Sequence, residues 1–301
     1  RNSNRGTFSS TFAAFHAHRP LLPSELRHLH EHRYAVVPGW LTDAADIGAL
    51  RADSLAVAAH GSLCGVGRSG ARRVDEGIRR SRQCTIIRPP PSNSAGCVDT
   101  RACLVRAVHS LRAELQGAEQ LRVGQPRSGR AALPHLAPHE TELLYLNYPI
   151  GGHYRRHLDQ PYGDAGWQRC GRAASDGGSL SGARTRRAVS FVIYLNKGWD
   201  AADGGALRLF PAHERLYGSQ VSVGHVADVL PEGGTLVLMM SGDVEHAVAE
   251  TVAERQAVVG WFRECGSGRV PDLDATSLRT LRMLGCEATS GSCRAMAAAL
   301  D

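Results

Sequence analysis

The sequence contains no apolar run long enough to form a membrane-spanning helix, which needs about 18 or more consecutive apolar residues. Its N-terminal residues 1–18 are polar and rich in His and Arg, and they lack the apolar stretch of a secretory signal peptide. We therefore expect neither a membrane span nor a signal peptide. Because the first residue is Arg1 and not Met, a targeting segment or a further domain can precede it.

Lysine is nearly absent, since Lys197 is the only one among 35 Lys and Arg residues. The formal net charge is +6, and a basic chain can bind nucleic acid or other acidic partners. However, no aromatic residues alternate with Arg72-Arg73, Arg79-Arg80 or the run 184–187, as they do on a surface that stacks bases. We therefore assign these arginines to solvated loops and expect no nucleic-acid partner.

Cysteine spacing gives no sign of a zinc site, because the eight cysteines form no CxxC pair and no compact metal-binding cluster. In a chain without a signal peptide, reduced thiols are expected. In an oxidising compartment, Cys286 and Cys293 near the C-terminus would be the candidates for a bridge.

The first part of the chain combines helical patterns with little strand content. Residues 1–20 show little apolar periodicity and are expected to form a disordered lead-in. Residues 21–135 are expected to form a mainly helical α/β support region. Its expected helices are 25–32, 43–59 and 100–120, its strands are 34–37 and 84–87, and its loops are 61–82 and 89–96.

From residue 136 to residue 265, the pattern changes to short strands separated by glycine turns. Many short strands without intervening helices predict a double-sheet jelly roll or a barrel. The fold is expected to be mainly β, with a double-stranded β-helix (jelly-roll) core and supporting helices. Residues 165–187, rich in Gly, Ser and Arg, are expected to form a flexible insertion, and 266–301 a C-terminal extension. The expected strands are 143–148, 153–157, 189–195, 206–210, 226–229, 235–239 and 257–262.

Two candidate metal ligands, His157 and Asp159, stand at the end of an expected strand. Because side chains alternate across a strand, residues i and i+2 project from the same face. Two imidazoles and one carboxylate on one face of an Fe(II) ion leave positions open for an oxo-acid and O2. An HxD pair alone also occurs in many chains that bind no metal. The second imidazole must come from another strand, and His246, after the strand 235–239, is the candidate.

Arg255 follows His246 by nine residues and begins the apolar strand that ends at Phe262. Alternation places Arg255 on the face of Ala257, Val259 and Trp261, which is the inner face if the strand belongs to a barrel. A buried guanidinium is costly unless it is paired, and it offers a bidentate partner for the distal carboxylate of 2-oxoglutarate. The alternative is that Arg255 is the exposed end of the strand.

Several ordered motifs accompany these residues: Tyr148-Pro149, Tyr154 to Asp159, Ile193 to Asp200, Gly204 to Pro211, and finally His246, Arg255 and Trp261. With them, residues 142–264 resemble the catalytic domain of the prolyl 4-hydroxylase superfamily of Fe(II)- and 2-oxoglutarate-dependent dioxygenases. The resemblance is greatest to the hypoxia-sensing (HIF-type) prolyl hydroxylases, because collagen-type enzymes usually carry lysine at the position of Arg255.

The resemblance implies that His157, Asp159 and His246 bind Fe(II) and are the catalytic residues. It implies that Arg255 and the Tyr194 hydroxyl contact the distal carboxylate of 2-oxoglutarate. The remaining implied pocket residues, each of which can also be read as an ordinary core residue, are Tyr148, Leu207 and Trp261. The implied cofactors and co-substrates are Fe(II), 2-oxoglutarate, O2 and ascorbate.

The reaction implied by the resemblance is 4-hydroxylation of a prolyl residue in a protein or peptide, with release of succinate and CO2. One alternative is a hydroxylase of a free amino acid or other small molecule, and another is a non-catalytic jelly-roll binding module. The insertion 165–187 is longer than the corresponding link in the hypoxia-sensing enzymes, and the loop 61–82 does not match them, so the substrate stays open. A cytoplasmic or nuclear location, as in the hypoxia-sensing relatives, is expected, whereas the collagen-type relatives lie in the secretory pathway. The resemblance leaves the oligomeric state open.

Overall fold

The described part of the chain comprises residues 18–61, 64–65, 75–86, 95–120, 133–160, 167–169, 184–211 and 227–265 of a computed structural model. The extension 266–301, residues 1–17, the Cys286 and Cys293 pair, and much of the expected loops 61–82 and 89–96 and of the insertion 165–187 lie outside it. Residues 18–20 were expected to be disordered, which was wrong. The Arg19 N–H donates to the Trp40 carbonyl, and the Arg19 guanidinium pairs with Glu25 at 2.6 Å, so local contacts order this segment.

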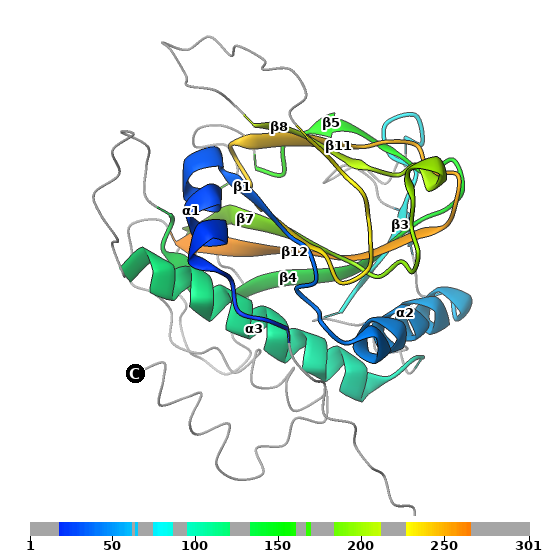
Figure 1. The fold of residues 1–301 in the computed structure, drawn as a ribbon, viewed down its shortest axis with the longest axis horizontal. Coiled ribbons are helices and arrows are strands. Elements are labelled where there is room, and N and C mark those ends of the chain that lie inside the picture. The colour runs from blue at the N-terminus through cyan, green and yellow to red at the C-terminus, as the bar shows by residue number, and fades with distance from the viewer. Residues whose placement is uncertain are drawn as a thin grey trace, which may run out of the picture.

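Two antiparallel β-sheets face each other in a jelly-roll arrangement, which confirms the expected fold class (Figure 1). The large sheet has the order β1 (Tyr34–Val37), β10 (Leu236–Met240), β7 (Arg184–Tyr194), β12 (Arg255–Cys265), β4 (Leu136–Tyr148), β3 (Arg82–Thr85) and β2 (Cys64–Gly65). A short strand, β6 (Gln168–Arg169), also pairs with β7. The small sheet has the order β5 (Tyr154–His157), β11 (Val244–Val248), β8 (Leu207–Pro211) and β9 (Ala227–Val229).

Three helices lie on the outer side of the large sheet, namely α1 (Pro23–His32), α2 (Ala44–Ala59) and α3 (Val98–Gln120) (Figure 1). Pro23 fits the first turn of α1, where a backbone N–H is not needed, and the Asp43 side chain caps α2 by accepting from the Ala45 N–H. A short 3-10 helix, η1 (Ala201–Asp203), follows β7. Among the described helices, none is both long and apolar enough to cross a membrane.

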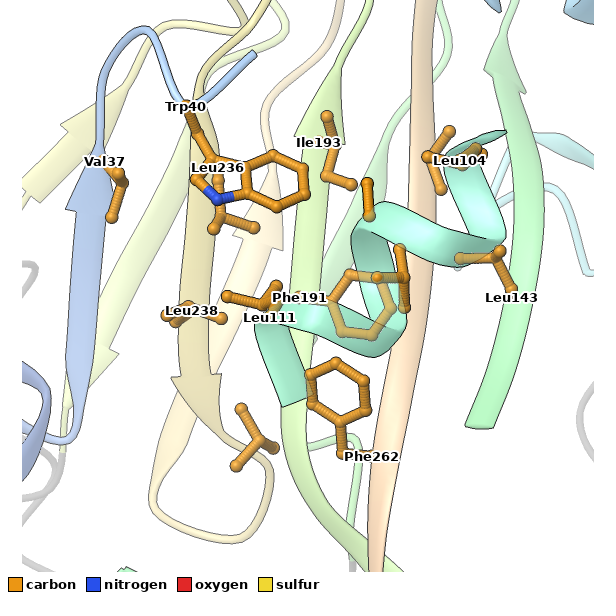
Figure 2. Close-up of a cluster of buried hydrophobic side chains, with 14 of the residues drawn as sticks. Val37, Trp40, Leu104, Leu111, Leu143, Phe191, Ile193, Leu236, Leu238 and Phe262 are labelled. Carbon is orange, nitrogen blue, oxygen red and sulfur yellow. The ribbon is translucent and has the colours of Figure 1, made fainter. Parts of the chain in front are cut away.

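Alternating side chains of the large sheet contribute to two separate cores. On β12, Val258 and Phe262 face the helices, whereas Ala257 and Val259 face the small sheet. The side facing the helices forms an outer core with α3, and Figure 2 shows Val37, Trp40, Leu104, Leu111, Leu143, Phe191, Ile193, Leu236, Leu238 and Phe262 within it. The side facing the small sheet forms a barrel core that includes Leu146, Tyr148, Val192, Tyr194, Leu207, Leu209, Val237, Met239, Val244, Val248 and Trp261.

The structure corrects three sequence-based expectations about strands. Strand β11 was not expected, although its residues alternate between buried and partly buried. It follows β10 after a turn of only three residues, so it was not recognised as a strand separate from the expected strand 235–239. The expectation that 165–187 form a flexible insertion was partly wrong, because Gln168 and Arg169 form β6 by pairing with the start of β7. The expectation that 61–82 form a loop was also partly wrong, since β2 lies within this range and Arg82 begins β3.

Candidate metal centre

Three potential metal ligands meet where β5 and β11 lie side by side in the small sheet. His157 is the last residue of β5 and lies directly opposite His246 of β11 in the strand register. Asp159 follows two residues later, with one carboxylate oxygen 3.6 Å from His157 Nε2 and the other 3.7 Å from His246 Nε2. The potential ligand atoms of these residues all lie within 4.8 Å of one another, so one small cation can contact all three.

Backbone hydrogen bonds orient both imidazoles. His157 Nδ1 lies 2.8 Å from the Arg155 carbonyl oxygen, and His246 Nδ1 lies 3.2 Å from the Val244 carbonyl oxygen. A carbonyl can only accept, so each Nδ1 carries a proton, and in the neutral imidazole Nε2 then keeps its lone pair. This tautomer directs both Nε2 lone pairs to the shared space beside Asp159, as is usual for metal-binding histidines.

The protonation states of the cluster also suit a cation. Burial and the neighbouring His157 lower the pKa of His246 to about 4, which leaves its imidazole neutral at neutral pH. Burial opposes ionisation of Asp159, but the facing imidazoles and a hydrogen bond from Ser190 outweigh it and hold the pKa of this carboxyl below its usual range. Two neutral imidazoles and one carboxylate are the donor set that Fe(II) takes in oxygenases, where three further positions stay open.

Arg255, at the start of β12, is a buried cation in the barrel core. Its side chain is 1% exposed, and its Nε and Nη1 atoms have no hydrogen-bond partner among the described residues. Its guanidinium lies 4.8 Å from the ring centre of Tyr148 and 5.0 Å from that of Tyr194. The expectation that alternation turns Arg255 inward therefore agrees with the structure, and its position is not the exposed end of a strand.

The hydroxyl of Tyr194 is a second buried polar group without a hydrogen-bond partner in the described chain. Burial, only partly offset by Arg255, raises the pKa of Tyr194 to about 12, so the hydroxyl stays protonated and can donate. Unpaired buried donors are expensive, and here a guanidinium and a phenol share one region. An anion with several acceptor oxygens, such as a carboxylate, fits both.

A close glycine contact shapes the space around Arg255. Gly205 has a φ of +66°, and a Cβ built on it would lie 3.0 Å from Arg255 Cδ and 3.1 Å from the Thr251 side chain. Glycine at this turn therefore allows η1 and β8 to pass close to the guanidinium. Leu207 is buried in the barrel core at the start of β8, and Trp261 lies six residues from Arg255 along the inner face of β12.

Three residues to which no role was assigned from the sequence also lie at the site, and the assignment of Arg79 and Arg187 to solvated loops was wrong, because Arg79 pairs with Tyr154 and Arg187 belongs to β7. The Tyr154 ring stacks on His157 at 3.6 Å, and the Arg79 guanidinium lies 4.6 Å from the centre of the Tyr154 ring. The guanidinium of Arg187, on β7, lies 3.7 Å from the ring centre of Trp261, on β12. Tyr154 and Arg79 come from two different segments, and the alternation of side chains along one strand cannot predict which segments pair.

Comparison with known proteins gives the site its context. Residues 143–263 match the model of the 2OG-Fe(II) oxygenase superfamily. A solved Pseudomonas putida prolyl-4-hydroxylase is 26% identical, with a TM-score of 0.56 over 81% of this chain and 100% of that chain.

Two curated proteins are similar over the same part of the chain. Egl nine homolog 1 of Rattus norvegicus and prolyl hydroxylase EGLN3 of Mus musculus are each 30% identical over 125 residues, which is 40% of this chain. The match spans 28% of the first relative and 40% of the second. The similarity is thus to the prolyl hydroxylases, and it is confined to less than half of each of these two curated proteins.

Proposed function

We propose that the chain, whose residues 143–263 match the model of the 2OG-Fe(II) oxygenase superfamily, hydroxylates a prolyl residue of a protein or peptide at C4, releasing succinate and CO2. One observation carries this proposal: three metal-ligand side chains and a buried Arg255 without an anionic partner among the described residues share one barrel. The prolyl substrate is supported by the similarity to prolyl hydroxylases from mouse and Pseudomonas putida.

In this proposal, His157, Asp159 and His246 hold Fe(II), which supplies the one-electron chemistry that activates O2 when bound. The Nδ1 hydrogen bonds keep both imidazoles oriented, so binding requires little rearrangement. The low pKa values of His246 and Asp159 mean that few protons compete for these ligands at neutral pH.

Arg255 and Tyr194 bind the distal carboxylate of 2-oxoglutarate in this proposal. The guanidinium supplies fixed charge and the phenol supplies one donor, and both are desolvated in advance. Tyr148 backs the guanidinium, while Leu207 and Trp261 exclude water from the barrel interior. Ascorbate is proposed as a reductant that keeps the iron in the Fe(II) state between turnovers.

The direct test is succinate formation from 2-oxoglutarate with Fe(II) and ascorbate, with and without a panel of proline-containing peptides. We expect peptide-stimulated turnover in the wild type and its loss in His157→Ala and Arg255→Ala. His60→Ala at the exposed end of α2 is the matched control and should keep full activity. Mass spectrometry of the stimulating peptide should show one added oxygen on proline.

Each alternative function has its own outcome in this assay. Succinate formation stimulated by free amino acids but by no peptide would favour a small-molecule hydroxylase. A wild type that binds neither Fe(II) nor 2-oxoglutarate would leave the non-catalytic binding module as the remaining reading. A cytoplasmic or nuclear location is a further proposal, which fractionation of cells that make the protein would test.

A further inference from the structure

Asp159 differs from the two histidines in how its position is fixed. His157 and His246 sit opposite each other in a strand ladder of the small sheet, whereas Asp159 lies beyond the end of β5. No strand pairing therefore holds the carboxylate in place. Its backbone neighbours and its side-chain partners must do so.

We propose that Ser190, Ser241 and Gln160 form a clasp that holds the Asp159 carboxylate against the large sheet and thereby sets how tightly the chain retains its divalent metal. The inference rests on the proposed function only in taking His157, Asp159 and His246 as the metal site. The three clasp residues are positioning residues, since they act on the metal through Asp159.

The two serines form the side-chain part of the clasp. Their Oγ atoms lie 2.8 Å apart, and each residue is 1% exposed. A hydrogen bond from Ser190 is also one of the interactions that keep the pKa of the Asp159 carboxyl low. Because a carboxylate only accepts, the Ser190 hydroxyl is the donor in that contact, which leaves its oxygen to accept from the Ser241 hydroxyl. Hydrogen bonds in such a chain polarise and strengthen one another.

Gln160 forms the backbone part of the clasp. Its N–H donates to the Ser241 carbonyl at 3.0 Å, and its side-chain oxygen accepts from the Arg187 N–H at 3.1 Å. The Ser241 N–H donates in turn to the Ala188 carbonyl at 2.9 Å. Gln160, the residue after Asp159, is thus tied to β7 and to the turn after β10, both in the large sheet. These bonds anchor the chain next to Asp159, whose carboxylate lies beside the two histidines of the small sheet.

The clasp follows from the faces of the strands. Ser190 shares its face of β7 with Val192 and Tyr194, which are apolar or aromatic members of the barrel core. A hydroxyl at this position is buried and must find a partner, and Asp159 provides an ionised one. Hydrogen bonds to a charged group are roughly twice as strong as neutral ones, so Ser190 is the first clasp residue to test.

The test measures Mn2+ binding by calorimetry, without 2-oxoglutarate and without turnover. Loss of an outer hydrogen-bond partner of a metal ligand typically weakens metal binding about 10- to 100-fold, and we expect a loss of this size for Ser190→Ala. Ser190→Thr keeps the hydroxyl and should bind within about threefold of wild type. Ser54→Ala removes an equally buried serine from α2 and is the matched control.

A double-mutant comparison tests whether the serines act in series. If Ser241 works through Ser190, Ser241→Ala should weaken Mn2+ binding on its own and add little to Ser190→Ala. Circular dichroism and melting of the metal-free variants identify any that do not fold. If Ser190→Ala proves unfolded, Ser241→Ala and Gln160→Ala decide the matter by the same affinity measurement.

The outcomes separate the clasp from the metal site itself. A wild type that binds Mn2+, with binding abolished in His157→Ala but unchanged in Ser190→Ala, would overturn the clasp and leave the metal site standing. A folded wild type that binds no Mn2+ at His157 would overturn both. Equal losses in Ser190→Ala and Ser54→Ala would also overturn the clasp, because burial alone would then explain the effect.

Discussion

Arg255 introduces a positive charge into the barrel core, and the described residues place no carboxylate beside it. Tyr194 adds a protonated hydroxyl without a partner in the same region. A folded chain tolerates such groups where a ligand completes their hydrogen bonds. The two side chains therefore make separate contributions to one proposed carboxylate site, and the contribution of the phenol can be measured alone.

Tyr194→Phe removes the hydroxyl and keeps the ring beside Arg255. A hydrogen bond to a charged group contributes about 1.5–3 kcal/mol, so we expect the KM for 2-oxoglutarate to rise roughly tenfold or more. Mn2+ affinity should not change, because the metal ligands are untouched. Tyr34→Phe on β1 is the control, and an unchanged KM in Tyr194→Phe would exclude the phenol from the co-substrate site.

Part of the site could be predicted from single residues and part could not. His157, Asp159 and Arg255 could be singled out because the alternation of side chains along a strand predicts which face each of them projects from. His246 was found by its position after the strand 235–239 and before Arg255, although its own strand β11 was missed. The contacts of Ser190 with Asp159, and of Arg79 with Tyr154, join different strands. Periodicity along one strand carries no information about such pairs.

At the scale of elements, β12 connects the two cores. Arg255 and Trp261 lie on its inner side, while Gly260 faces the helices between Val258 and Phe262. A Cβ built on Gly260 would lie 2.2 Å from Phe191 Cζ and 2.5 Å from the Glu142 carbonyl oxygen. Glycine is required here because the Phe191 ring packs directly on the strand.

Gly260→Ala should therefore destabilise the fold, since overpacking a core typically costs about 1–3 kcal/mol. Gly117→Ala in α3 is the matched control, because a Cβ built there meets nothing within 4 Å. Alanine favours a helix by roughly 0.5–1 kcal/mol over glycine, so this variant should be more stable. Urea unfolding should shift the two midpoints in opposite directions, and a Gly260→Ala midpoint at or above wild type would contradict the packing described.

The bounds of helices and strands were predicted most accurately where a single segment of regular apolar periodicity forms a single helix or strand. The helix expected at 43–59 and the strand expected at 34–37 agree closely with α2 and β1. Strands β6 and β2 have two residues each and exist only because β7 and β3 pair with them. Strands this short have no periodicity of their own, so their sequences could not predict them.

At the scale of the whole molecule, Glu142 connects three strands of the large sheet. Its carboxylate on β4 contacts Arg187 of β7 and, at 2.7 Å, Arg263 of β12. Burial alone would raise the pKa of Glu142, but these two guanidinium groups lower it below its ordinary value of 4.5. Because the folded pKa is the lower one, this stabilisation is present above pH 4.5 and is lost as the pH falls through the folded value.

We therefore expect Glu142→Gln to be less stable than wild type at pH 7 and to lose less of its stability between pH 6 and pH 3. Glu245→Gln removes the carboxylate of a surface pair with Arg156 and serves as the control. Thermal melts of the metal-free proteins across this pH range measure the difference. Parallel melting curves for Glu142→Gln and wild type would contradict the assigned role.

The edge of the large sheet has a consequence for how the chain acquires its structure. Among the described strands, β1 pairs only with β10, so Tyr34 cannot pair until Met239 has been synthesised, roughly 200 residues later. Contacts between residues so distant in sequence form slowly. While the ribosome is still adding residues, β1 and α1 therefore emerge with an unsatisfied strand edge and an uncovered apolar face. The N-terminal segment depends on the last strands of the barrel, and a chain released before β10 would expose it to aggregation.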